Sequence, residues 1–91
     1  MDKVKGTTST GFNFSIDPED VKDMRVVELM AKVKHDGLYI VEMANRILGE
    51  KQKDALYKHL EDKKGRVNSE KFGNALEEIM EAVNKAEQTK N

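Results

Sequence analysis

The chain has 91 residues and a formal net charge of −1 at pH 7, although 36% of its residues are charged. A chain of this length forms one domain with a small core, and its near-zero charge disfavours general binding to nucleic acid or to anionic membranes. The sequence has no cysteine, which excludes disulfides, thiolate metal sites and a cysteine nucleophile.

The first residues are polar and show no periodicity. GTTSTG, residues 6–11, is rich in Gly, Thr and Ser, a composition typical of flexible linkers. Residues 1–15 lack the apolar region of a secretory signal, and the longest apolar run, Leu38–Val41, is far too short to cross a bilayer. We therefore expect a flexible lead over residues 1–11 and no membrane association.

An alternating pattern follows in GFNFSIDPED, residues 11–20. Phe12, Phe14 and Ile16 alternate with polar residues, which predicts a short extended or β segment over residues 12–16 with one apolar face. An isolated strand is unstable in water. This segment must therefore dock on its own domain, pair with another copy or insert into a partner.

Helical periodicity covers most of the remaining chain. Asp17 and Pro18 suit the N-cap and the first position of a helix. Apolar residues at three- and four-residue spacing, separated by turns that contain glycine, predict four helices. The predicted helices cover residues 18–34, 39–48, 50–62 and 68–85, and residues 86–91 form a frayed tail.

These elements predict an all-α fold, with about four short helices in a compact orthogonal bundle over residues 12–85. The last helix carries the clearest apolar stripe, in which Phe72, Leu76, Ile79 and Val83 recur every three or four residues. The helices must share one small core, since the chain shows no internal repeat.

No pattern in the sequence predicts a catalytic, cofactor or metal site. GTTSTGFN has the glycine spacing of a phosphate-binding loop, but Phe12 stands where the lysine is required. His35 and His59 have no second histidine at metal-binding spacing. The serines have no neighbouring base or glycine elbow. We expect a protein that is not an enzyme.

A helix-turn-helix DNA-binding regulator is one alternative. The lysine-rich segment 51–66 precedes a helix in the position of a recognition helix. That helix, SEKFGNALEEIMEAV, carries four glutamates against one lysine, and the phosphates of DNA would repel it. The sequence therefore favours a protein partner over a nucleic acid.

Methionines and aromatic residues are the candidate partner-binding groups. Unbranched thioethers adapt to irregular surfaces, so methionines on apolar helix faces can fill a core or contact a partner. The predicted partner-binding residues are Phe12, Phe14, Ile16, Met24 and Met30.

The order of these segments resembles the small tail assembly chaperones of long-tailed, siphovirus-type bacteriophages and prophages of Gram-positive bacteria. The resemblance lies in GFNFSIDPED, DMRVVELMAKV, ILGEKQKDALYKHLEDKKGRV and EEIMEAV, and it covers roughly residues 11–85. The family pattern LLG-E-Q-x-x-x-L-x-x-H-L, followed by a turn ending in Gly-Arg-Val, is matched by Leu48, Gly49, Glu50, Gln52, Leu56, His59, Leu60, Gly65, Arg66 and Val67. Asn68 departs from the proline that is common in the family.

This resemblance implies a non-catalytic assembly factor in the cytoplasm of the bacterial host. Members of the family coat the helical tape-measure protein before the tail tube polymerises, and they are absent from the finished particle. A longer frameshifted product in that family recruits the tail tube protein. The resemblance therefore predicts the tape-measure protein as partner and leaves self-association open. A structural tail or connector component of the virion is the other alternative.

Overall fold

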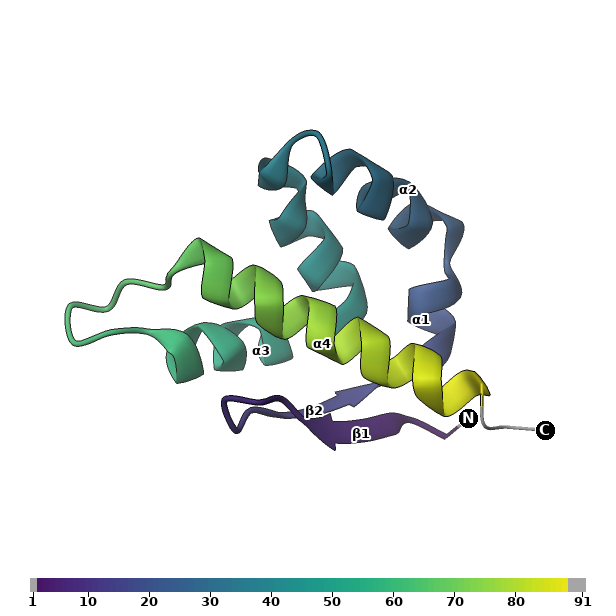
Figure 1. Cartoon of the computed structure of the whole chain (residues 1–91), viewed down its shortest axis with the longest axis horizontal. Helices are drawn as coiled ribbons and strands as arrows, with labels where there is room; N and C mark the ends of the chain where they lie inside the picture. The colour runs from purple at the N-terminus through teal and green to yellow at the C-terminus, as the bar shows by residue number, and fades with distance from the viewer. Residues whose placement is uncertain (1, 89–91) are drawn as a thin grey trace.

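The computed structural model describes residues 2–88, and helix makes up 68% of the chain. The expected, mostly helical class is confirmed, with a small sheet added (Figure 1). The elements in the described part are β1 (Val4–Thr7), β2 (Asn13–Ile16), α1 (Pro18–Lys22), α2 (Met24–Val33), a 3-10 turn η1 (Gly37–Tyr39), α3 (Ile40–Leu60) and α4 (Ser69–Gln88).

Val4–Thr7 of the N-terminal lead form the strand β1, which corrects the expectation of a flexible segment over residues 1–11, of which residue 1 lies outside the described part. β1 pairs antiparallel with β2, so that Val4 lies opposite Ile16 and Gly6 opposite Phe14. A lone strand is unstable in water. The predicted strand over residues 12–16 therefore forms together with a partner from the lead.

A short turn joins the two strands. The backbone N–H of Thr8 donates to the carbonyl of Phe12 at 2.9 Å, and the N–H of Phe12 donates to the hydroxyl of Thr8 at 3.1 Å. Gly11 has a φ of 95°, a conformation that glycine adopts without steric cost. The Gly/Thr/Ser tract therefore forms the end of β1 and the hairpin turn, and it is not a linker.

Two helices hold the hairpin through side chains. The amide of Gln52 on α3 accepts from the N–H of Ser15 and donates to its carbonyl, both at 2.9 Å. Gln52 thus pairs with the backbone N–H and carbonyl of Ser15 in β2, as a neighbouring strand would. The carboxylate of Glu78 on α4 accepts from the N–H and the hydroxyl of Ser9, at 2.8 and 2.9 Å.

The predicted helix over residues 18–34 is two helices in the structure. Asp17 caps α1 as expected, accepting from the N–H of Glu19 at 3.0 Å. Asp23 then leaves helical conformation, with ψ at 129°, and its carboxylate accepts from the N–H of Arg25 to start α2. Asp side chains compete with the helix backbone in this way, and the prediction missed that break.

The predicted break at Gly49 is confirmed, although the two segments form the single kinked element α3. Gly49 has φ 77° and ψ 159°, so the helix before it and the helix after it have different directions. The second segment ends at Leu60, two residues before the predicted end.

α4 begins as predicted and ends later. The side chain of Asn68 accepts from the N–H of Lys71 at 3.0 Å, as a helix N-cap does. The helix continues to Gln88 instead of fraying after residue 85, and a salt bridge between Lys22 and Glu87 joins its last turn to α1. Residues 89–91 of the predicted tail lie outside the described residues.

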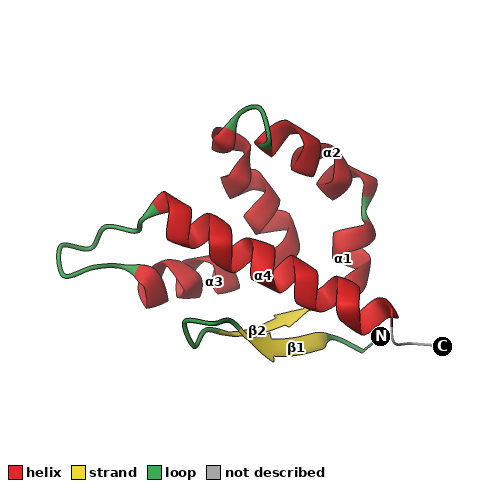
Figure 2. Ribbon diagram, in the orientation of Figure 1, coloured by secondary structure: helices red, strands yellow, loops and turns green. Residues whose placement is uncertain are grey.

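The core lies around α4, which has the hairpin on one side and α2 with the first segment of α3 on the other (Figure 2). Apolar side chains from these elements and from the second segment of α3 meet there. The largest fully buried ones are Ile16, Val26, Leu56, Leu76, Ile79 and Val83. No helix in residues 2–88 is long and apolar enough to span a bilayer.

Candidate functional site

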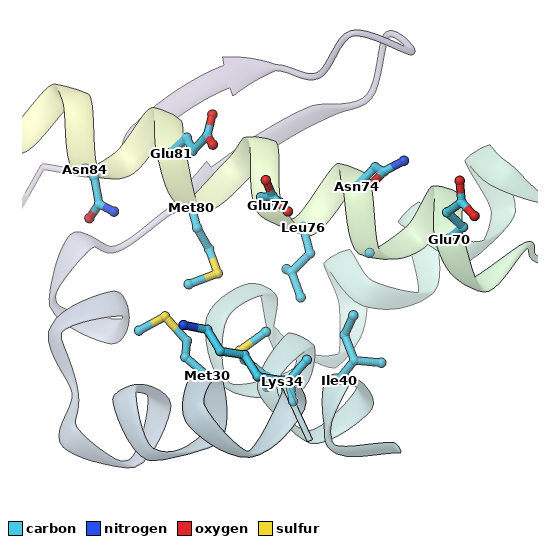
Figure 3. A pocket seen from close by; sticks show the side chains of 13 residues that line it. Met30, Lys34, Ile40, Glu70, Asn74, Leu76, Glu77, Met80, Glu81 and Asn84 are labelled. Atoms are coloured by element: carbon cyan, nitrogen blue, oxygen red, sulfur yellow. The ribbon is translucent and has the colours of Figure 1, made fainter. Parts of the chain in front are cut away.

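An apolar groove of about 480 Å³ lies between α4 and the pair formed by α2 and the start of α3 (Figure 3). We call it the methionine groove. Its apolar lining is Met30, Val33, Ile40, Met43, Gly73, Leu76 and Met80, and its polar lining is Lys34, Glu70, Asn74, Glu77, Glu81 and Asn84. The lining on α4 runs from Glu70 to Asn84, about 21 Å of helix, so the groove extends along most of α4.

Methionines form much of the groove's surface. Met43 is buried, whereas Met30 and Met80 are half-buried, and Figure 3 shows Met30 and Met80 extending toward each other from opposite walls. Thioether side chains change rotamer at little cost. The groove can therefore fit apolar side chains of different shapes.

α4 contributes two parallel rows to the groove. Gly73, Leu76 and Met80 lie in the inner row. The outer row is Glu70, Asn74, Glu77, Glu81 and Asn84, spaced alternately by four and three residues. This average spacing of about 3.5 residues keeps a row facing one partner along the length of a helix.

The polar border is mainly acidic. Glu70, Glu77 and Glu81 lie along α4, and Lys34 at the end of α2 is the one cation among the groove-lining residues. Within residues 2–88, no salt bridge involves any of these four side chains. The three carboxylates therefore lie beside apolar surface without a cationic partner.

Three of the predicted partner-binding residues are in the core. Phe12, Phe14 and Ile16 are 7%, 5% and 1% exposed, and the ring of Phe12 packs against His59 with centroids 5.7 Å apart. Of the three arrangements open for this segment, the structure shows docking on its own domain. These side chains are therefore not available on the surface, which corrects the prediction of a partner-binding strand.

Met24 and Met30 are separated by the structure. Met24, at the first position of α2, is 73% exposed and lies outside the groove, whereas Met30 lines it. Leu38 in η1 is also strongly exposed, at 83%. Only Met30 of the five predicted residues therefore contributes to the candidate site.

The two histidines have different surroundings. His35 is exposed, and Nε2 of His59 lies 3.0 Å from the carbonyl oxygen of Thr10, where it holds the hairpin turn. In the described part of the chain, no group of three or more His, Asp or Glu side chains is placed to hold a metal ion.

A second hollow, of about 300 Å³, lies between α2 and α3. Four of its five charged side chains form two pairs, because Nζ of Lys32 lies 3.8 Å from Oε2 of Glu28 and Nε of Arg46 lies 3.9 Å from Oε2 of Glu42. These pairs are exposed and weak. The hollow offers little apolar surface, and Arg25 gives its lining one more cation than anions.

The groove could not be predicted from the sequence, because its lining residues resemble ordinary core residues and ordinary solvent-exposed residues. Ile40, Met43, Leu76 and Met80 lie on helix faces that the pattern assigns to the interior, and the glutamates of α4 look like a solvated face. The only sequence signal was the concentration of methionines on those faces.

Comparison of the chain with models of protein families, with curated proteins and with solved structures found no match in any of the three.

Proposed function

We propose that this protein is a non-catalytic tail assembly chaperone of a long-tailed bacteriophage, acting in the cytoplasm of the bacterial host. In this proposal it binds helical segments of the tape-measure protein and keeps that protein soluble until the tail tube assembles. The likeness of residues 11–85 to the chaperone family supplies the partner. We also propose that the helices pack as an orthogonal bundle, as expected from the sequence.

The methionine groove is the observation that carries the proposal. Long apolar grooves between helices bind amphipathic helices, which place residues at i, i+3, i+4 and i+7 into the groove. An adaptable thioether surface suits a partner that presents many different segments. A groove of this length, open along α4, therefore fits one segment of a long helical protein.

Repetition of a weak contact is consistent with coating. Several copies bound along one partner give a high avidity from a modest affinity per copy. Polymerising tube subunits can then displace the copies one at a time, because no single contact is strong. A small domain with one groove suits this use.

Binding of DNA by a helix-turn-helix is less well supported. Residues 61–68 separate α3 from α4, whereas the turn of that motif has about three or four residues. The exposed border of α4 carries Glu70, Glu77 and Glu81, which phosphates would repel. A low-salt gel shift with duplex DNA would show binding if this alternative were correct.

Co-expression with the tape-measure protein from the same gene cluster tests the proposal. We expect the tape-measure protein to stay soluble and to co-purify with the chaperone, and we expect Met80→Glu to abolish both effects because it places a charge in the groove. Met24→Glu adds the same charge outside the groove and is the matched control. Unchanged solubility with no co-purification of the wild-type chain would contradict the proposal.

Mass spectrometry of purified particles separates the chaperone from a structural virion component. A chaperone is absent from the mature particle, whereas a tail or connector protein is retained at fixed stoichiometry. Detection of the chain as a stoichiometric component would favour the connector alternative.

A further inference from the structure

We propose that the segment held by the methionine groove is a basic amphipathic helix of about four turns, lying along α4 with its cationic border against the glutamates. This inference rests on the proposed function and names the chemistry of its partner. It follows from the length of the groove, the spacing of its rows and the sign of its border.

The groove's length sets the size of the segment. Its lining on α4 extends from Glu70 to Asn84, about 21 Å, which equals four turns of an α-helix. The apolar wall opposite, with Met30 and Ile40, faces this same stretch in Figure 3. A helix that crossed α4 steeply would contact only part of this wall.

The spacing of the outer row sets the direction of the segment. Its residues recur on average every 3.5 positions, and this spacing keeps two helices in contact when they cross at about 20°. A partner helix lying nearly along α4 would therefore meet Glu70, Glu77 and Glu81 in succession.

The charge of the border sets the sign of the partner. The border contains three carboxylates and one ammonium group, that of Lys34, and none of these side chains has a salt-bridge partner within the described residues. Partner lysines or arginines spaced by seven and four residues would match Glu70, Glu77 and Glu81. Apolar contacts next to these pairs would exclude water and strengthen them.

A second copy of the chain fits the groove poorly. Its longest regular helix, α4, presents this same acidic border, so two copies of α4 would bring like charges together along the groove. Like charges across an interface oppose association. The acidic border therefore favours a different, basic chain.

Two synthetic peptides test the inference. Both are helices of about 18 residues with the same apolar stripe, and they differ only in whether lysines or glutamates border that stripe. We expect the lysine peptide to bind the full chain at least about tenfold more tightly than the glutamate peptide at about 0.1 M salt, from three weak ion pairs. This preference should shrink at about 1 M salt, where the Debye length falls to about 3 Å.

Charge reversal on α4 provides the second arm. Glu77→Lys with Glu81→Lys should reverse the preference between the two peptides. Asp54→Lys with Glu61→Lys changes the net charge equally at exposed positions on α3 and beyond its end, outside the groove, and should leave the preference intact. Circular dichroism confirms that each variant is folded.

The outcomes distinguish this inference from the proposed function. Equal affinity for both peptides, lost on Met80→Glu, would overturn the charge preference and leave apolar helix binding standing. Binding of neither peptide would overturn the inference, while co-expression with the tape-measure protein decides the function separately. Sedimentation that shows a dimer broken by Glu77→Lys with Glu81→Lys would assign the groove to a second copy and overturn the inference.

Discussion

Gly6 is required at its position because the ring of Phe14 lies directly over it. A methyl group on Gly6 would lie 2.7 Å from Cζ of Phe14, and Phe14 is buried and cannot move freely. We expect Gly6→Ala to lower the free energy of unfolding by about 1–3 kcal/mol through overpacking, measured by urea denaturation. Gly37→Ala is the control, since a methyl group there meets no atom within 4 Å. Equal effects of the two substitutions would contradict this packing.

Phe14 acts as a core residue, so its truncation should affect stability first. We expect Phe14→Ala to lower the free energy of unfolding by about 3–5 kcal/mol. Met24→Ala removes an exposed side chain and should change it by less than about 0.5 kcal/mol. Thermal and urea unfolding of both variants provide the measurement. Loss of partner binding by Phe14→Ala at unchanged stability would restore the partner-binding role predicted from the sequence.

Gly73, in the inner row of α4, leaves space in the groove but lowers the stability of the helix. A methyl group there would lie 3.5 Å from Cδ1 of Ile40, an ordinary contact, and glycine inside a helix is less stable than alanine by about 1 kcal/mol. We expect Gly73→Ala to stabilise the chain by about 0.5–1 kcal/mol. Gly73→Leu should fill the space beside the inner row of α4 and block partner binding, while the fold is kept. Denaturation combined with co-purification separates the two effects, and undiminished binding by Gly73→Leu would contradict the assignment of the groove.

At the scale of elements, the hairpin depends on its contacts with α3 and α4. Glu78 accepts two hydrogen bonds from Ser9 in the hairpin turn, whereas its neighbour Glu77 borders the groove. We expect Glu78→Ala to destabilise the docked turn by on the order of 1 kcal/mol and to speed hydrogen exchange at the amide of Ser9. Glu77→Ala should leave that amide unchanged. Equal exchange rates in the two variants would show that the turn is held by other contacts.

The loop between α3 and α4 depends on pH through Asp62. Its carboxylate accepts from the backbone N–H groups of Arg66 and Lys64 and from Nε of Arg66, and these bonds, the backbone bond of Arg66 first, hold the pKa of Asp62 below its usual range. A lowered pKa adds stability above about pH 4, and this contribution is lost as the pH falls through the folded value.

We therefore expect the amide resonances of Lys64 and Arg66 to shift together, with a midpoint below about pH 4. Nuclear magnetic resonance over a pH titration measures this midpoint. Asp62→Ala should abolish the shared transition. A midpoint at or above the ordinary value would show that the carboxylate gains no net stabilisation from the loop.

Local signals predicted the positions of most helices, but they missed one strand and one helix break. Asp17, Gly49 and Asn68 act within one turn of their own positions, so caps and kink follow from sequence. β1 was missed because its sequence, VKGT, has no alternating apolar pattern, and the strand forms only through pairing with Asn13–Ile16 across the turn. The break at Asp23 was missed because aspartate occurs both inside helices and at caps.

At the scale of the molecule, the placement of apolar and acidic side chains defines the candidate site. The net charge is close to zero, yet Glu70, Glu77 and Glu81 line one border of one groove. Sequence could not show this, because a methionine on a helix face packs into a core or borders a groove according to where the other helices lie. The methionine pattern was compatible with a core or with an apolar binding surface, and the fold determines which methionines line the groove.

The central claim is that the methionine groove holds a helix of the partner. Methyl resonances of methionine in a titration with a soluble helical segment of the tape-measure protein test it most directly, since Met30, Met43 and Met80 line the groove and Met24 lies outside it. We predict large, saturable shifts at the three groove methionines and none at Met24. Shifts confined to Met24, or none at saturating partner, would contradict the account.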